Sequence, residues 1–152
     1  MSNIIVRRAG ADDLAAIVAL LAHDPLGEQR EDPSTPLNPA YVEAFEAIDA
    51  DPNQLLAVIA EDDRVVGSLQ LTFIPGLSRT GAWRGQIEAV RVAADRRSAG
   101  LGARAFEWAI DQCRARGCRL VQLTTDRGRP EAHAFYERLG FTASHLGYKK
   151  TL

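Results

Sequence analysis

The sequence predicts an α/β fold with a mixed, mostly antiparallel central sheet and helices on both of its faces. Strand-like and helix-like runs follow one another in the order β-α-α-β-β-β-α-β-α-β-β. The strands flanking the helix after Gly100 need a crossover connection and should be parallel, whereas the polar turn from Glu61 to Arg64 joins two runs as an antiparallel hairpin. The length of 152 residues suits one domain, so we expect residues 1–152 to form it.

The first third of the chain predicts one strand and two helices. Ile4–Ala9 is expected to be an edge strand, and an amphipathic helix with an acidic first turn should run from Asp12 to about His23. The segment Asp24–Pro39 contains four prolines and few large apolar groups, which predicts a loop. A second short helix follows over Tyr41–Ala50.

The remaining elements follow from local patterns of apolar and turn residues. A hairpin is expected to end at Pro75 and Gly76. After it we expect a strand over 85–94, a helix from the Gly100 loop to about Arg116, a strand over 118–126, a helix over 130–139 and a terminal strand pair over 140–152. Simple alternation in the 85–94 strand would place Gln86, Glu88, Val90 and Val92 on one face and Ile87, Ala89 and Arg91 on the other.

The stretch "RRSAGLG", from Arg96 to Gly102, predicts an anion site. Gly100 and Gly102 let the backbone approach a ligand closely, and the first turn of the following helix has N–H groups without partners inside the helix. The helix dipole and the guanidinium groups of Arg96 and Arg97 would add positive potential there. A tight turn that only leads into a core helix is the competing interpretation, because short glycine patterns are weak signals.

The dinucleotide fingerprint G-x-G-x-x-[GA] also matches "GLGARA", and Asp126 lies near the end of the next strand. A dehydrogenase is disfavoured because the glycines do not follow their strand at once, a hairpin precedes them, and little chain remains for a second mononucleotide unit. No Walker loop and no G-x-S-x-G elbow occurs in the chain.

Composition excludes several other classes. The net charge of −2 gives no general attraction to nucleic acid or to acidic membranes, which favours a small partner. Cys113 and Cys118 lack metal-ligand spacing, so we expect neither a disulfide framework nor a metal site, and a reducing cytoplasm as the location. The longest apolar run, Leu14–Ala22, is too short to span a bilayer.

Two motifs together resemble the GNAT superfamily of N-acetyltransferases. "VRVAADRRSAGLG" is similar to its acetyl-CoA-binding signature [QR]-x-x-G-x-[GA], with Arg97, Gly100 and Gly102 at the matching positions. "AHAFYERLGF", from Ala132 to Phe141, is similar to a second signature, a helix ending in Y-E-x-x-G-F. The chain departs from the family at Arg129, where many members have an asparagine.

The resemblance implies acetyl-CoA as co-substrate and no metal. It implies that the strand before the glycine loop pairs with the pantetheine arm and that the loop cradles the pyrophosphate. The cofactor-binding residues implied in this way are Val90, Arg91, Val92, Arg97, Ser98, Ala99, Gly100, Leu101, Gly102 and Ala103.

Acetyl transfer to an amine needs a base, oxyanion donors and a proton for the leaving thiolate. Glu88 is our candidate base, because alternation would place it on the face of Val90 and Val92; a structural acid paired with an arginine is the alternative. Tyr136 is our candidate general acid, since a phenol is protonated at neutral pH, although aromatic core packing is the competing explanation.

The acceptor is expected to be a small-molecule primary amine, with Trp83 and Arg84 as an aromatic wall and an anion-binding group. A protein N-terminus or lysine as acceptor stays open, as does a non-catalytic acyl-CoA-binding module. We expect no nucleic acid or membrane partner, and a homodimer also stays open.

Overall fold

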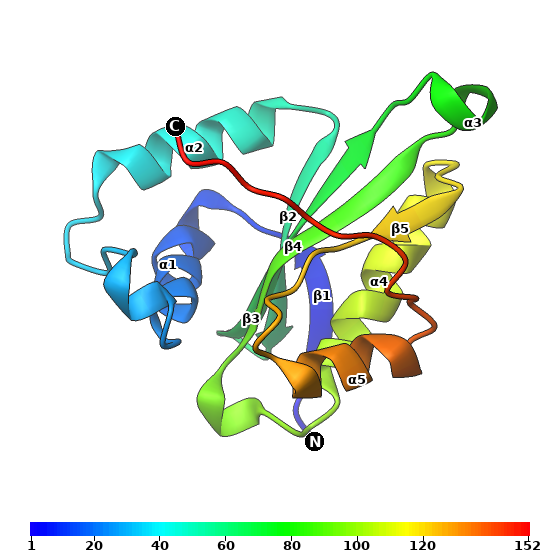
Figure 1. Ribbon diagram of the computed structural model, residues 1–152. Coiled ribbons are helices and arrows are strands. Elements are labelled where there is room, and N and C mark those ends of the chain that lie inside the picture. The colour runs from blue at the N-terminus through cyan, green and yellow to red at the C-terminus, as the bar shows by residue number, and fades with distance from the viewer.

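The computed structural model describes residues 1–152 and contains a five-stranded sheet between two layers of helices (Figure 1). The elements, in chain order, are β1 (Ile4–Arg8), η1 (Ala11–Asp13), α1 (Leu14–Ala22), η2 (Gly27–Gln29), α2 (Pro39–Ala50), β2 (Gln54–Glu61), β3 (Arg64–Ile74), α3 (Ser78–Gly81), β4 (Arg84–Val92), η3 (Ala94–Arg96), α4 (Leu101–Ala115), β5 (Leu120–Gln122) and α5 (Pro130–Arg138).

The sheet has the strand order β1-β2-β3-β4-β5. Neighbouring strands are antiparallel except β4 and β5, which are parallel because α4 crosses over between them. The predicted fold class, a mostly antiparallel mixed sheet with helices on both faces, is therefore confirmed.

Each face of the sheet buries its own set of apolar side chains. Figure 1 shows α1 and α2 on one side and α4 and α5 on the other. Side chains of β2 point alternately to the two faces and are buried on both. Val58 packs with Ile17 of α1, while Ile59 belongs to the larger core cluster under α4. The larger cluster holds 13 buried residues and includes Phe106 of α4, so most of the core lies on the α4 side.

α4 packs closely on β4 at Gly85. A Cβ atom built on Gly85 would lie 2.2 Å from Sγ of Cys113 and 3.5 Å from its Cβ. Cys113 is 1% exposed, and burial raises the pKa of its thiol to about 12. A glycine at position 85 therefore sets how near the helix can come to the strand.

Three predicted strands differ from the structure. The strand expected over 118–126 contributes only Leu120–Gln122 to the sheet, because pairing with β4 ends at Gln86. The terminal strand pair expected over 140–152 is not formed, since no residue after Arg138 belongs to a helix or strand. Its alternating sequence is strand-like, but no strand of the same chain pairs with it.

None of the helices combines the length and the apolar character needed to cross a membrane.

We expect Gly85→Ala to destabilise the protein by about 1 to 3 kcal/mol, because the added methyl group overlaps the Cys113 sulfur in a packed core. Chemical denaturation measures the change. Cys113→Ala removes the sulfur. In the Cys113→Ala background, Gly85→Ala should therefore cost less than half of the unfolding free energy that it costs in the parent protein. Equal losses in both backgrounds would contradict this account of the contact.

Candidate active site

The N-terminus of α4 presents backbone donors with no partner in the chain. Gly100 is the N-cap residue, with φ of +78°, and provides no side-chain cap. The first backbone bond at this end runs from the N–H of Arg104 to the carbonyl of Gly100, so the N–H groups of Leu101, Gly102 and Ala103 are free. Free N–H groups at the positive end of a helix dipole attract an anion.

A cavity of about 290 Å³ lies at this helix end. Its lining includes seven of the ten cofactor-binding residues that the resemblance implies, but not Val90, Arg91 or Ala99. Arg96 and Phe135 complete the wall. The lining residues are Val92, Arg96, Arg97, Ser98, Gly100, Leu101, Gly102, Ala103 and Phe135.

Phe135 was not singled out from the sequence as a cavity residue. It comes from α5, and a Cβ built on Gly102 would lie 3.6 Å from its Cζ atom. Phe135 precedes Tyr136 in the second motif, and this position was the only indication in the sequence that it could lie near the loop. Which of the two aromatic side chains faces the loop depends on how α5 packs against α4.

Two ion pairs fix the loop that precedes the cavity to the turn of the β2–β3 hairpin. Arg64 donates to both carboxylate oxygens of Asp95, at 2.7 and 2.9 Å, and Arg96 donates to Glu61. Both arginines of the "RRSAGLG" stretch were expected to add positive potential at the helix start, but the structure shows that they are not equivalent. The charge of Arg96 is compensated by Glu61, whereas Arg97 is exposed and makes no ion pair in the chain.

The strands β4 and β5 stop pairing at Gln86, before β4 reaches the cavity at Val92. β5 pairs with residues Arg84 to Gln86 only, and β4 continues alone on this side to Val92. This edge of β4 therefore offers backbone groups to an extended ligand, as the edge of any sheet does.

A β-bulge in β4 overturns the expected alternation of its side chains. Gln70 of β3 pairs with Glu88, but Ser68 pairs with Arg91, so β4 has one extra residue between these pairs. Ala89 takes the left-handed conformation there, with φ of +54°. After the bulge Val90 and Val92 pack against the α4-side core, while Glu88 lies on the other face.

Glu88 is exposed and has no hydrogen bond or ion pair in the chain. The alternative of an acid paired with an arginine does not apply to it. The prediction that it shares a face with Val90 and Val92 is wrong, because the bulge separates them. Its free carboxylate lies directly before the bulge, on the sheet face of α1 and α2.

The arginine beyond the bulge is bound instead by Asp24, at the end of α1. Nε of Arg91 lies 2.7 Å from Oδ2 of Asp24, and both side chains are largely buried. Burial acts to raise the pKa of Asp24, but the hydrogen bond from the Gly27 N–H and the charge of Arg91 outweigh it and hold this pKa below its ordinary value. This pair joins the loop after α1 to β4.

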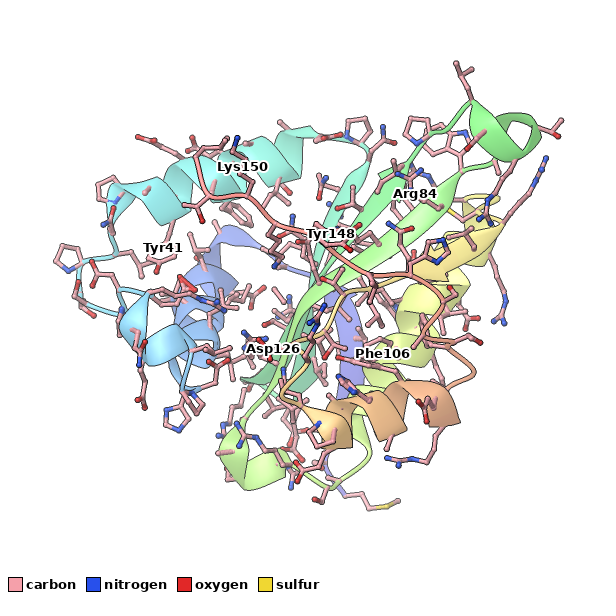
Figure 2. The ribbon with its side chains drawn as sticks, in the orientation of Figure 1. Tyr41, Arg84, Phe106, Asp126, Tyr148 and Lys150 are labelled. Atoms are coloured by element: carbon pink, nitrogen blue, oxygen red, sulfur yellow. The ribbon has the colours of Figure 1, made fainter.

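Tyr136 belongs to an aromatic cluster between α4 and α5. Its ring centroid is 5.6 Å from that of Phe106, which Figure 2 labels, and 6.3 Å from that of Phe141. The ring is half-buried, and its hydroxyl group makes no hydrogen bond in the chain. The ring thus packs in the core as one interpretation expected, while the hydroxyl stays available.

Trp83 and Arg84 do not line one surface. Trp83 packs against the core on the α4 side, and its neighbour Arg84 points to the opposite face because consecutive strand residues alternate. The aromatic wall expected from Trp83 is therefore not beside Arg84. Arg84 itself shares the face of Gln86 and Glu88, before the bulge, and has no ion pair.

Arg129, at the family's usual asparagine position, is exposed and precedes the first turn of α5 without capping it. No group of histidine, cysteine and acidic side chains is arranged to hold a metal ion.

Comparison with known proteins connects this geometry to a reaction. Residues 21–141 match the model of the acetyltransferase (GNAT) family. The aminoalkylphosphonate N-acetyltransferase of Salmonella typhimurium is 31% identical over 113 residues, which cover 74% of this chain and 73% of that protein.

Solved structures resemble the whole chain. A protein of Bacillus halodurans C-125, described as a transcriptional regulator, is 45% identical with a TM-score of 0.96, over 99% of this chain and 100% of that one. An acetyltransferase of Trypanosoma brucei is 27% identical with a TM-score of 0.81, over 99% and 100% of the two chains.

We expect Asp24→Asn to lower the free energy of unfolding by about 1 to 2 kcal/mol at pH 7, because a charge-assisted pair with Arg91 is lost. A carboxyl whose pKa is lowered in the folded state stabilises the protein above its unfolded pKa of about 4 and loses this effect as the pH falls. The difference between the two proteins should therefore vanish in acid. Denaturation at several pH values measures it, with the exposed Asp49→Asn as control; a pH-independent difference would contradict the ion pair's role.

Proposed function

The chain belongs to the acetyltransferase (GNAT) family and is an acyltransferase, and from this premise we propose that it transfers the acetyl group of acetyl-CoA to a primary amine of a small molecule. Transfer is direct, in a complex that holds both substrates, and residues 1–152 act as one catalytic domain. When bound, acetyl-CoA supplies an acetyl group activated as a thioester.

The observation that carries the proposal is the cavity at the start of α4. Three free backbone N–H groups, the uncompensated guanidinium of Arg97 and the dipole of a 15-residue helix meet there, which suits a pyrophosphate. Gly102 lies opposite the ring of Phe135, so an acidic side chain at this position would enter the cavity. Arg97 binds the phosphates, and Arg96 holds the loop in place through Glu61.

The unpaired edge of β4 supports the remaining part of the co-substrate site. Backbone groups of Val90, Arg91 and Val92 pair with the pantetheine arm, because β5 leaves this edge free after Gln86. Backbone N–H groups near Val90 and Val92 would hold the oxygen of the thioester as its charge develops.

Glu88 serves as base, directly or through a water molecule. Its carboxylate is exposed and unpaired, so no arginine competes with the ammonium group of an acceptor. Glu88 does not share a face with Val90 and Val92, so the role is argued instead from its place immediately before the bulge, next to the free edge of β4.

Tyr136 serves as general acid and gives its phenolic proton to the departing thiolate. Packing against Phe106 and Phe141 fixes the ring, and the hydroxyl has no partner in the chain that would compete for its proton.

The acceptor is a small amine that also carries an anionic group. The related Salmonella enzyme is an aminoalkylphosphonate N-acetyltransferase. Arg84 lies on the face of Glu88 and has no ion pair, so its guanidinium is available to such a group. A protein N-terminus or lysine is the second acceptor class, and the net charge of −2 gives no general attraction to nucleic acid.

Release of CoA thiol across a panel of amines tests the reaction. The panel contains aminoalkylphosphonates, the matching aminoalkyl carboxylates, neutral amines and lysine peptides. Turnover highest with an anionic small amine supports the proposal. Turnover only with peptides would show that the acceptor is a protein. Binding of acetyl-CoA without turnover would indicate a non-catalytic module.

We expect Gly102→Asp to weaken acetyl-CoA binding by about 100-fold or more, because a carboxylate in the cavity repels the pyrophosphate. The same change should preserve or raise the melting temperature, since an acidic residue in the first turn favours the helix dipole. Calorimetric titration and thermal melting measure the two effects. Gly102→Ala is the matched control, because its methyl group meets Phe135 at an ordinary contact distance and should bind acetyl-CoA nearly as well.

We expect Tyr136→Phe to lower the chemical step by about 100-fold while acetyl-CoA affinity stays within a few-fold. The hydroxyl makes no hydrogen bond in the chain, so its removal should leave the melting temperature almost unchanged. Single-turnover kinetics and melting of the same protein separate rate from stability. A Phe variant with the parent rate would remove Tyr136 from the reaction.

A further inference from the structure

The turn that ends α4 brings the two cysteines of the chain together. Gly117 takes the left-handed conformation there, with φ of +76°. Its N–H donates to the carbonyl of Arg114 at 3.0 Å, and the N–H of Cys118 donates to the carbonyl of Cys113 at 2.9 Å. These two bonds define a Schellman motif, in which the third-last residue of the helix and the second residue beyond its cap frequently touch. Cys113 and Cys118 hold these two positions.

Both thiol groups are free, and they lie near enough that each shifts the pKa of the other. Cys113 is buried in the core cluster on the α4 side, whereas Cys118 packs against this cluster and stays partly exposed. A reagent from solvent therefore meets Cys118 first. Cys113 is positioned to react only with its neighbour.

A cavity of about 230 Å³ borders both cysteines, and its wall includes the apolar side chains of Ile110 and Val121. It shares no lining residue with the cavity at Gly100, because the two lie at opposite ends of α4. The hydrogen bond between the backbones of Cys113 and Cys118 keeps their Cα atoms within the ~7 Å that a disulfide tolerates. The cavity leaves room for the two sulfur atoms to turn toward each other.

The surroundings of the two thiols are positively charged. Arg114 and Arg119 line the cavity, and Arg116 lies in the turn between the cysteines. Arg114 is paired with Asp111, but Arg116 and Arg119 make no ion pair and bind only uncharged oxygen atoms. This charge attracts a small reagent that carries carboxylate groups.

We propose that Cys113 and Cys118 form a reversible disulfide by exchange with an anionic small-molecule disulfide, and that the closed disulfide fixes the end of α4 to the chain entering β5. The thiolate of Cys118 attacks one sulfur of the reagent, which forms a mixed disulfide and releases one small thiolate. The thiolate of Cys113 then attacks the sulfur of Cys118 and releases the second small thiolate. Two electrons pass from the cysteines to the reagent, and the two thiol protons end on the released thiolates.

Burial of the two thiols determines how this exchange behaves. It raises the pKa of Cys113 to about 12. It also raises the pKa of Cys118, and the neighbouring thiol and the charge of Arg116 offset only part of this effect. Exchange should therefore be slow at neutral pH, where little thiolate is present. Since the reduced protein stabilises neither thiolate, the closed disulfide should resist reduction.

Incubation with mixtures of reduced and oxidised glutathione tests the exchange, because glutathione disulfide is small and anionic. The chain has only these two cysteines, so the protein mass after alkylation of the remaining thiols identifies each product. At about pH 8 the parent should lose the mass of two hydrogen atoms and take up no alkylating reagent, and a dithiol reductant should reverse both changes. A parent that stays reduced in oxidised glutathione, or that keeps a bound glutathione, would overturn the proposal.

Two single substitutions separate the roles of the cysteines. Cys113→Ala should keep one glutathione on Cys118, because no second thiol is present to release it. Cys118→Ser should take up none, because Cys113 is 1% exposed. Thermal melting verifies that both variants are folded. An adduct on Cys113 in the folded Cys118→Ser variant would contradict Cys118 as the point of attack.

Melting of the oxidised parent tests whether the disulfide fixes the turn. Closing the short ring from Cys113 to Cys118 removes chain entropy from the unfolded state, so the oxidised parent should melt about 5 °C above the reduced parent. Amides of residues 116–119 should also exchange hydrogen more slowly. Cys118→Ser treated in the same way is the matched control and should not change. An oxidised parent that melts at or below the temperature of the reduced one would overturn the stabilising role.

Discussion

The close packing of α4 on β4 is the constraint on which the site depends. Gly85 leaves no side chain between strand and helix, and the buried sulfur of Cys113 fills the space against it. With the helix this near the sheet, its N-terminus ends beside the last residues of β4. The free donors of α4 and the free edge of β4 thereby become parts of one continuous surface.

Electrostatics at this surface depend on which arginine is compensated. Glu61 and Asp95 hold the loop from the hairpin side, and they use Arg96 and Arg64 for this purpose. The anchoring therefore compensates one of the two positive charges before the glycines and leaves the guanidinium group of Arg97 without an ion pair. The Arg64–Asp95 pair is exposed and by itself adds little stability, but together with the more buried Arg96–Glu61 pair it restricts the position of this short loop.

Much of the fold, and the glycine turn that begins α4, could be predicted because their signals are local. The turn residues of the hairpin, the periodicity of α4 and the spacing of Arg97, Gly100 and Gly102 lie within short windows of sequence. What could not be predicted depends on distant partners. The bulge at Ala89 follows from register with β3, the Arg96–Glu61 pair joins residues 35 positions apart, and the pairing of β5 with β4 ends at Gln86.

The bulge also makes the number of residues in β4 part of the design of the site. Ala89 is the one residue of β4 that changes the face on which later side chains lie. Removal of Ala89 would restore regular alternation and leave Val90 and Val92 on the α4 side, whereas regular pairing with Ala89 retained would turn both side chains to the α1 side. Ala89 itself is exposed and contributes little to the core, so we expect its deletion to be tolerated better than insertion of a further residue in β4, which would turn the later side chains to the opposite face or require a second bulge.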